Sequence, residues 1–164
     1  VSAVTDDRRR LVHVTLEEDA RIRLSPEVRH ERAVAVFDLL ADNRFALIGD
    51  DRGPYRLHIA IQENRLVFDV RDAADAAIEH VRLPLTPLRT VIRDYFRICD
   101  AYYEAIRTAT PSRIEAIDIG RRAAHDDGAA LLRERLAARL EIDENTGRRL
   151  FTLICVLHVR DWRG

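Results

Sequence analysis

The stretch Tyr55-Arg-Leu-His-Ile-Ala-Ile-Gln-Glu-Asn-Arg-Leu-Val-Phe-Asp-Val70 decides how the first half of the chain folds. On both sides of Glu63–Asn64, large apolar residues alternate with mostly polar ones, which is the pattern of two half-buried strands. The apolar positions are Tyr55, Leu57, Ile59, Ile61, Leu66, Phe68 and Val70. The sequence therefore predicts a β-hairpin with one side facing a core.

Shorter segments around this hairpin have the same period of two. Glu79–Leu85 and Leu11–Leu16 are candidate strands, and Arg44–Ile48 is another short one. Between them, Ser25 and Pro26 are typical of the start of a helix, because Ser caps free N–H groups and Pro suits the first turn. We expect that helix to end near residue 43.

The pattern changes to a helical period after Thr86–Pro87. Thr110–Pro111 indicates a second helix start, and that helix either runs to Leu140 or breaks near Gly120 or Gly128. Asp143 precedes a last apolar segment, residues 150–157, which is either a buried helix or a buried strand.

Together these segments predict an α+β fold. We expect a small antiparallel sheet, made of the hairpin plus one or two further strands. It packs with a helix from the N-terminal half and a C-terminal cluster of three to four helices. Because the chain has 164 residues and no linker-like tract, we interpret residues 1–164 as one domain, with residues 1–10 flexible.

The charge balance gives no general attraction to nucleic acid or to anionic membranes, since 27 basic residues face 28 acidic ones. Every basic residue is Arg, because the chain contains no Lys. This bias follows either from genome composition or from selection for bidentate anion contacts, and composition alone does not separate the two.

Cys99 and Cys155 lie far apart in apolar, helix-like segments, which favours core packing over a catalytic thiol. The first ten residues are polar and charged, unlike a signal peptide, and no apolar run approaches the ~20 residues that a membrane span needs. The expected location is the cytoplasm.

Six stretches, in order, carry a likeness to a known family. They are Ser25-Pro-Glu-Val-Arg-His-Glu-Arg-Ala-Val, Gly53-Pro-Tyr-Arg-Leu-His, Asn64-Arg-Leu-Val-Phe-Asp, Ala105-Ile-Arg-Thr-Ala, Ile114-Glu-Ala-Ile-Asp and Arg148-Arg-Leu-Phe-Thr-Leu-Ile-Cys-Val-Leu-His. The chain resembles, over about Leu11 to His158, a mainly alphaproteobacterial family of uncharacterised proteins that is numbered 0262. The resemblance implies a bacterial cytosolic protein and implies no activity.

The most informative polar residues lie between Ile114 and Leu132. In one unbroken helix, Asp118, Arg121 and His125 share a face, because residues three and four apart are neighbours. Arg121 and Arg122 would bind a phosphate or carboxylate, His125 would act as a general acid or base, and Asp118 would orient Arg or His. The alternative is a set of ordinary surface ion pairs.

Two further groups of residues are weaker candidates. Tyr103 and Arg107 would line a pocket mouth where two helices meet, or else lie at the edge of the core. Arg89, Arg93 and Arg97 form either a solvated helix face or a surface for an acidic partner. The six histidines show no ligand spacing, so we expect no metal and no cofactor.

Two functions remain open. The first is a non-catalytic binding or accessory module with an unknown protein partner. The second is a small enzyme or sensor that acts on an anionic metabolite through Arg107, Arg121, Arg122 and His125. Nucleic acid and membrane are disfavoured as partners, and the oligomeric state, with a homodimer as one option, stays open.

Overall fold

The computed structural model describes residues 7–17 and 23–158, and this part of the chain is an α+β fold. The elements follow the order β1, α1, β2, β3, β4, β5, α2, α3, β6, α4. Their bounds are β1 Leu11–Leu16, α1 Pro26–Ala41, β2 Phe45–Leu47, β3 Tyr55–Gln62, β4 Arg65–Asp72, β5 Ala77–Pro84, α2 Thr86–Thr108, α3 Pro111–Leu136, β6 Leu140–Ile142 and α4 Glu144–Leu157.

The predicted hairpin is confirmed. β3 and β4 pair antiparallel from Tyr55–Asp72 to Gln62–Arg65, and β5 pairs antiparallel with β4. The four-stranded sheet has the order β1-β3-β4-β5. The α+β class is confirmed, but the sheet, predicted as antiparallel, is mixed, because β1 pairs parallel with β3. Parallel neighbours need a long crossover, and here the chain passes through α1 before it returns as β3.

A second, two-stranded sheet joins distant parts of the chain. β2 pairs antiparallel with β6, from Phe45–Ile142 to Leu47–Leu140. The sequence predicted a strand near β2 but not β6, since three residues are too few to show a period. This pairing connects the segment that follows α3 to the N-terminal half of the chain.

The helices resolve the two alternatives that the sequence left open. α3 is a single helix, and residues 150–157 belong to helix α4. Ser25, Thr110 and Asp143 each cap a helix by accepting a hydrogen bond from a backbone N–H in its first turn. As far as residue 158, the C-terminal half therefore holds three helices, α2, α3 and α4.

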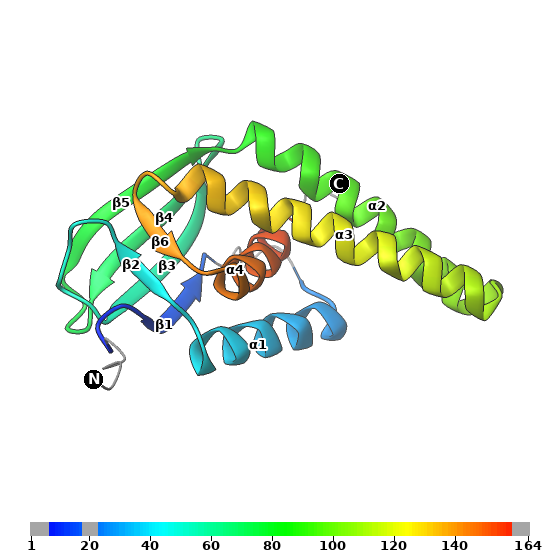
Figure 1. The fold of residues 1–164 in the computed structure, drawn as a ribbon, viewed down its shortest axis with the longest axis horizontal. Helices are drawn as coiled ribbons and strands as arrows, with labels where there is room; N and C mark the ends of the chain where they lie inside the picture. The colour runs from blue at the N-terminus through cyan, green and yellow to red at the C-terminus, as the bar shows by residue number, and fades with distance from the viewer. Residues whose placement is uncertain (1–6, 18–22, 159–164) are drawn as a thin grey trace, which may run out of the picture.

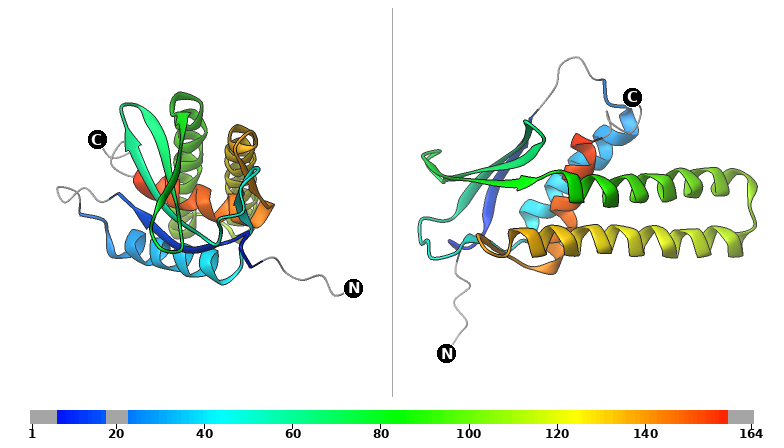
Figure 2. Two further views of the ribbon diagram at one scale, coloured as in Figure 1. Left: turned by 90° about the vertical axis from the view of Figure 1, so that its left-hand side faces the viewer. Right: turned by 90° about the horizontal axis from the view of Figure 1, so that it is seen from above.

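α2 and α3 form a long antiparallel hairpin that extends away from the sheet (Figures 1 and 2). α4 packs against α3, α1 and β3, and Figure 1 shows it between α3 and α1. Side chains from both halves form one hydrophobic core, with Phe68 and Leu57 of the sheet and Phe151 and Leu150 of α4 almost fully buried. The sheet-proximal ends of α2 and α3 contribute Leu88 and Leu132 to the same core.

Cys99 is half-buried and Cys155 is buried, as the sequence predicted, and burial raises the pKa of both thiols. Of the flexible segment predicted at 1–10, residues 1–6 lie outside the described part of the chain. Arg9, which lies in the described part, pairs with Glu141 of β6. No helix within residues 7–17 and 23–158 is long and apolar enough to cross a membrane.

Candidate functional site

Three of the residues singled out in the sequence, Arg121, Arg122 and His125, line one hollow of about 360 Å³. All four helices contribute to it, so we call it the junction pocket. Its lining residues are Glu31 of α1, Tyr95 of α2, Arg121, Arg122, His125 and Asp126 of α3, and Arg148 and Thr152 of α4. The shared helix face expected for Asp118, Arg121 and His125 follows from α3 being unbroken.

His125 is held by two aromatic rings and one hydroxyl. Its ring meets Tyr95 edge-on at 5.2 Å between centroids and Phe151 at 5.1 Å. Its Nε2 lies 2.8 Å from the Thr152 Oγ1 atom. Such packing fixes the rotamer of the imidazole.

The surroundings of His125 also set its protonation. Burial lowers the pKa of His125, and Arg121 and Arg148 add to this against the opposing charge of Asp126. The Thr152 hydroxyl donates to the backbone oxygen of Arg148 at 3.2 Å, so it accepts a hydrogen bond from His125 Nε2–H. His125 is therefore neutral near pH 7 and keeps Nδ1 as its basic nitrogen.

Asp118 binds two arginines at once. Its Oδ1 atom accepts from Arg121 at 2.6 and 3.0 Å, and its Oδ2 atom pairs with Arg122 at 2.9 Å. The hydrogen bond from Arg121 holds the pKa of Asp118 below its usual range. The guanidinium of Arg121 also lies 4.8 Å from the ring centre of Tyr102. Asp118 thus positions arginines, and the described contacts do not join it to His125.

The α4 side of the pocket was not predicted from the sequence. Arg148 donates to Asp126 at 2.9 Å, to Asn145 at 3.0 Å and to Glu144 at 2.8 Å. The spacing of Arg148 and Thr152, one turn apart, shows that they share a face of α4. It does not reveal which helix that face meets.

Tyr103 and Arg107 lie apart from the junction pocket. They line another hollow, of about 500 Å³, together with Asp100, Glu104 and Ile106 near the far end of the helical hairpin. Arg107 pairs with Glu104 one turn back on α2. The structure therefore brings Arg121, Arg122 and His125 together in one lining, while Arg107 and Tyr103 line the other hollow. Burial raises the pKa of Tyr103, and the charges of Glu31 and Arg121 also act on this hydroxyl.

Within residues 7–17 and 23–158, no three His, Cys, Asp or Glu side chains are arranged to hold a metal ion. The arginines of the ladder on α2, Arg89, Arg93 and Arg97, are exposed. The junction pocket is the place where three of the predicted site residues, Arg121, Arg122 and His125, converge.

The fold and the pocket define an α+β protein with a mixed sheet, a projecting helical hairpin and an arginine-lined hollow at its root. The chain belongs to the uncharacterised protein family UPF0262, whose model matches residues 8–160. This confirms the family resemblance read from the sequence.

Relatives in alphaproteobacteria cover nearly the whole chain. A UPF0262 protein of Nitrobacter winogradskyi is 54% identical over 97% of this chain and 93% of its own length. UPF0262 proteins of Rhodospirillum rubrum and Brucella anthropi are 53% and 56% identical, each over 94% of this chain and 95% of the relative. No solved structure matches this chain. The family name indicates no specific function.

Proposed function

We propose that this protein is a binding module for a small molecule with a carboxylate or phosphate group, which it holds in the junction pocket. The observation that supports this is the convergence of three guanidinium groups and a neutral imidazole on one hollow, from helices α3 and α4. The planar guanidinium group of arginine can donate two parallel hydrogen bonds to the oxygens of a carboxylate or phosphate.

The arginines of α3 keep N–H groups that can bind an anion. The pocket lining holds three arginines beside the carboxylates of Glu31 and Asp126, and Asp118, outside the lining, pairs with both Arg121 and Arg122. The Arg122 side chain is 74% exposed, so its remaining N–H groups can reach a ligand. Arg148 is already balanced by Asp126 and Glu144, and it supports the wall of the pocket.

The geometry of Thr152 favours binding over nucleophilic chemistry. Its hydroxyl hydrogen points to the backbone oxygen of Arg148 and not to His125, so the imidazole does not accept a proton from it. His125 instead offers Nδ1 as an acceptor for a hydroxyl or amide of the ligand.

The test is a thermal-shift screen of phosphorylated and carboxylated metabolites against the protein, since a ligand that binds only the folded state raises the melting temperature. Arg122→Gln removes the proposed anion contact. Arg113→Gln is the matched control, because Arg113 is an exposed arginine of the same helix that does not line the pocket.

We expect a ligand found in the screen to bind the Arg122→Gln variant about tenfold more weakly, which is equivalent to about 1.4 kcal/mol. Its affinity for the Arg113→Gln control should be unchanged. A hit that both variants bind equally well would overturn the proposal. A screen without any hit would also count against a small-molecule ligand and would favour a protein partner.

One observation favours an enzyme as a second candidate. A neutral His125 beside arginines has the protonation state of a general base for a bound anion. In that case His125→Gln abolishes turnover of the ligand found in the screen while binding persists. If ligand is bound but never converted by the unmodified protein, the protein is a sensor or carrier.

We also propose a cytoplasmic location. Both cysteines are free and have thiol pKa values raised by burial, which suits a protein that never needs a disulfide. Immunoblots of periplasmic and cytoplasmic fractions would check this, with recovery in the periplasm as the contrary result.

A further inference from the structure

The four-stranded sheet has a second face, which points away from the core. Along β3, β4 and β5 the core takes alternate residues such as Leu57, Phe68 and Val81, so the residues between them share the opposite face. We call this the open sheet face. It comprises Arg56, His58, Ala60, Gln62, Arg65, Val67, Asp69, Arg71, His80 and Arg82.

The arginines at one end of the open sheet face are neutralised. Arg71 Nε lies 3.1 Å from Asp69 Oδ2, and Arg56 Nε lies 3.5 Å from Asp75 Oδ1. Arg71 also donates to the backbone oxygen of Asp75 at 3.1 Å. This end of the face therefore carries little free positive charge.

The arginines at the other end differ from these. Among residues 7–17 and 23–158, no carboxylate forms an ion pair with Arg65 or Arg82, whereas Asp69 and Asp75 pair with Arg71 and Arg56. Arg82 donates to His80 Nδ1 at 3.3 Å, and the Nε2 atom of that imidazole lies 3.2 Å from Asp69 Oδ1. His80 thus holds Arg82 in place without cancelling its charge.

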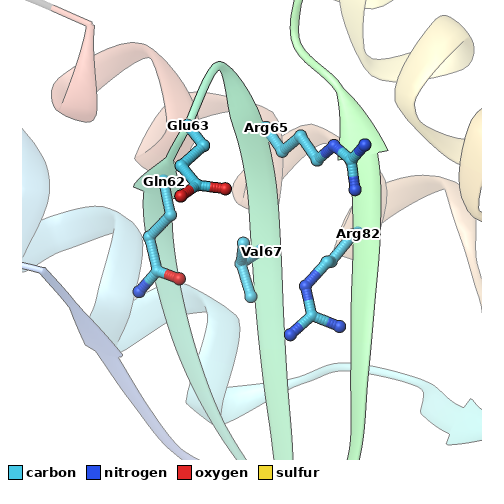
Figure 3. A pocket seen from close by; sticks show the side chains of 5 residues that line it. All are labelled: Gln62, Glu63, Arg65, Val67 and Arg82. Carbon is cyan, nitrogen blue, oxygen red and sulfur yellow. The ribbon is translucent and has the colours of Figure 1, made fainter.

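Arg65 and Arg82 border a hollow of about 380 Å³ (Figure 3). Val67, which is 4% exposed, forms its floor and pairs with Arg82 in the β4–β5 ladder. Figure 3 shows both arginines on one side of Val67, and Gln62 and Glu63 on the other. One side therefore donates hydrogen bonds and carries positive charge, while the other offers oxygen acceptors.

We propose that this hollow binds a small phosphorylated molecule that also carries hydroxyl groups. Arg65 and Arg82 bind the phosphoryl oxygens, and the hydroxyls donate to the carboxylate of Glu63 and the amide oxygen of Gln62. The lining has no aromatic ring on which a base could stack, which disfavours single-stranded nucleic acid. This site is separate from the junction pocket, because it lies on the sheet and not between the helices.

The experiment is an NMR titration of the ¹⁵N-labelled protein with ribose 5-phosphate, in physiological salt so that diffuse attraction is screened. Inorganic phosphate and ribose are titrated separately. Arg82→Gln and Arg65→Gln test the phosphoryl contacts, and Arg56→Gln is the control on the same face. Arg65 and Arg82 are exposed and Arg56 is half-buried, so we expect the first two variants to fold, and melting curves of all three variants check this.

We expect saturable shifts at Gln62, Glu63, Arg65 and Val67 and at Arg82, with affinity for ribose 5-phosphate about tenfold weaker in Arg65→Gln and Arg82→Gln. The Arg56→Gln variant should bind normally. Equal weakening in all three variants would indicate diffuse charge attraction and would overturn the proposal. So would shifts confined to residues 121–125, which would instead support the junction pocket. Inorganic phosphate binding as tightly as ribose 5-phosphate would refute the role of the hydroxyls.

Discussion

The environment of His125 determines how its charge responds to pH. Two aromatic rings and Thr152 enclose the imidazole, and burial lowers its pKa from the ordinary value of 6.5. The unfolded chain takes up a proton at this residue at a higher pH than the folded protein does. Stability is therefore lost as the pH falls through the unfolded-state pKa, and the loss stops growing below the folded-state value.

We predict that the free energy of unfolding falls less steeply between neutral and mildly acidic pH in the His125→Gln variant than in the unmodified protein. Urea unfolding at a series of pH values measures this. His30→Gln, at an exposed position of α1, is the control and should keep the original pH dependence. An unchanged slope in the His125→Gln variant would show that this residue is not the buried titrating group.

Asn43 closes the edge of the sheet at β1. Its side chain accepts from Leu11 N at 2.7 Å and donates to Leu11 O at 3.1 Å and to Leu39 O at 2.8 Å. Because Leu11 is fully buried, its backbone groups have little access to water if this side chain is removed.

We predict that Asn43→Ala lowers the free energy of unfolding by about 1–3 kcal/mol, the usual cost of unsatisfied buried polar groups. Asn145→Ala, at an exposed position of α4, should change it by less than about 0.5 kcal/mol. Chemical denaturation compares the two variants. If both lose the same amount, the bridging role of Asn43 is refuted.

Single residues were predictable from the sequence where one helix sets their positions. The grouping of Asp118, Arg121 and His125 followed from the helical period alone, given an unbroken α3. The sequence did not predict that Thr152 and Arg148 line the same pocket, because this depends on how α4 packs against α3. Arg107 was grouped with them on charge, yet it lies in another hollow.

At the scale of whole elements, the two glycines inside α3 differ in whether the surrounding structure leaves space for a side chain. A side-chain carbon at Gly128 would lie 2.2 Å from a ring carbon of Phe151, whereas one at Gly120 would meet nothing within 4 Å. Gly128 therefore permits the close approach of α3 and α4 that builds the junction pocket.

We predict that Gly128→Ala destabilises the protein by about 1–3 kcal/mol, the usual cost of overpacking. By contrast, Gly120→Ala should stabilise it by about 0.5–1 kcal/mol, because alanine favours a helix. Melting temperatures and urea midpoints of the two variants give the comparison. Stabilisation by both substitutions would mean that α3 and α4 do not pack this closely.

Helices and strands were predictable where the periodic pattern of apolar residues spans enough positions to be recognised. Alternation over eight residues predicted β3 and β4, and the Ser25, Thr110 and Asp143 caps marked three helix starts. The three-residue β6 and the parallel pairing of β1 were missed. Neither is a local property, since each depends on a partner distant in the chain.

At the scale of the whole molecule, the sheet and the helices divide the surface into two candidate sites. The junction pocket lies where α1 of the N-terminal half meets the three C-terminal helices, so it exists only when both halves share one core. The open sheet face lies on the side of the four-stranded sheet that points away from this core. Neither arrangement was visible in the sequence, because each depends on how the two layers pack.

The most direct test of the central claim is an NMR titration with the best ligand from the thermal-shift screen, following the imidazole of His125 and the guanidinium of Arg122. We predict saturable shifts of both signals with one dissociation constant, while the guanidinium signal of Arg113 stays still. Ligand binding that leaves His125 and Arg122 unshifted would contradict the claim that the junction pocket is the binding site.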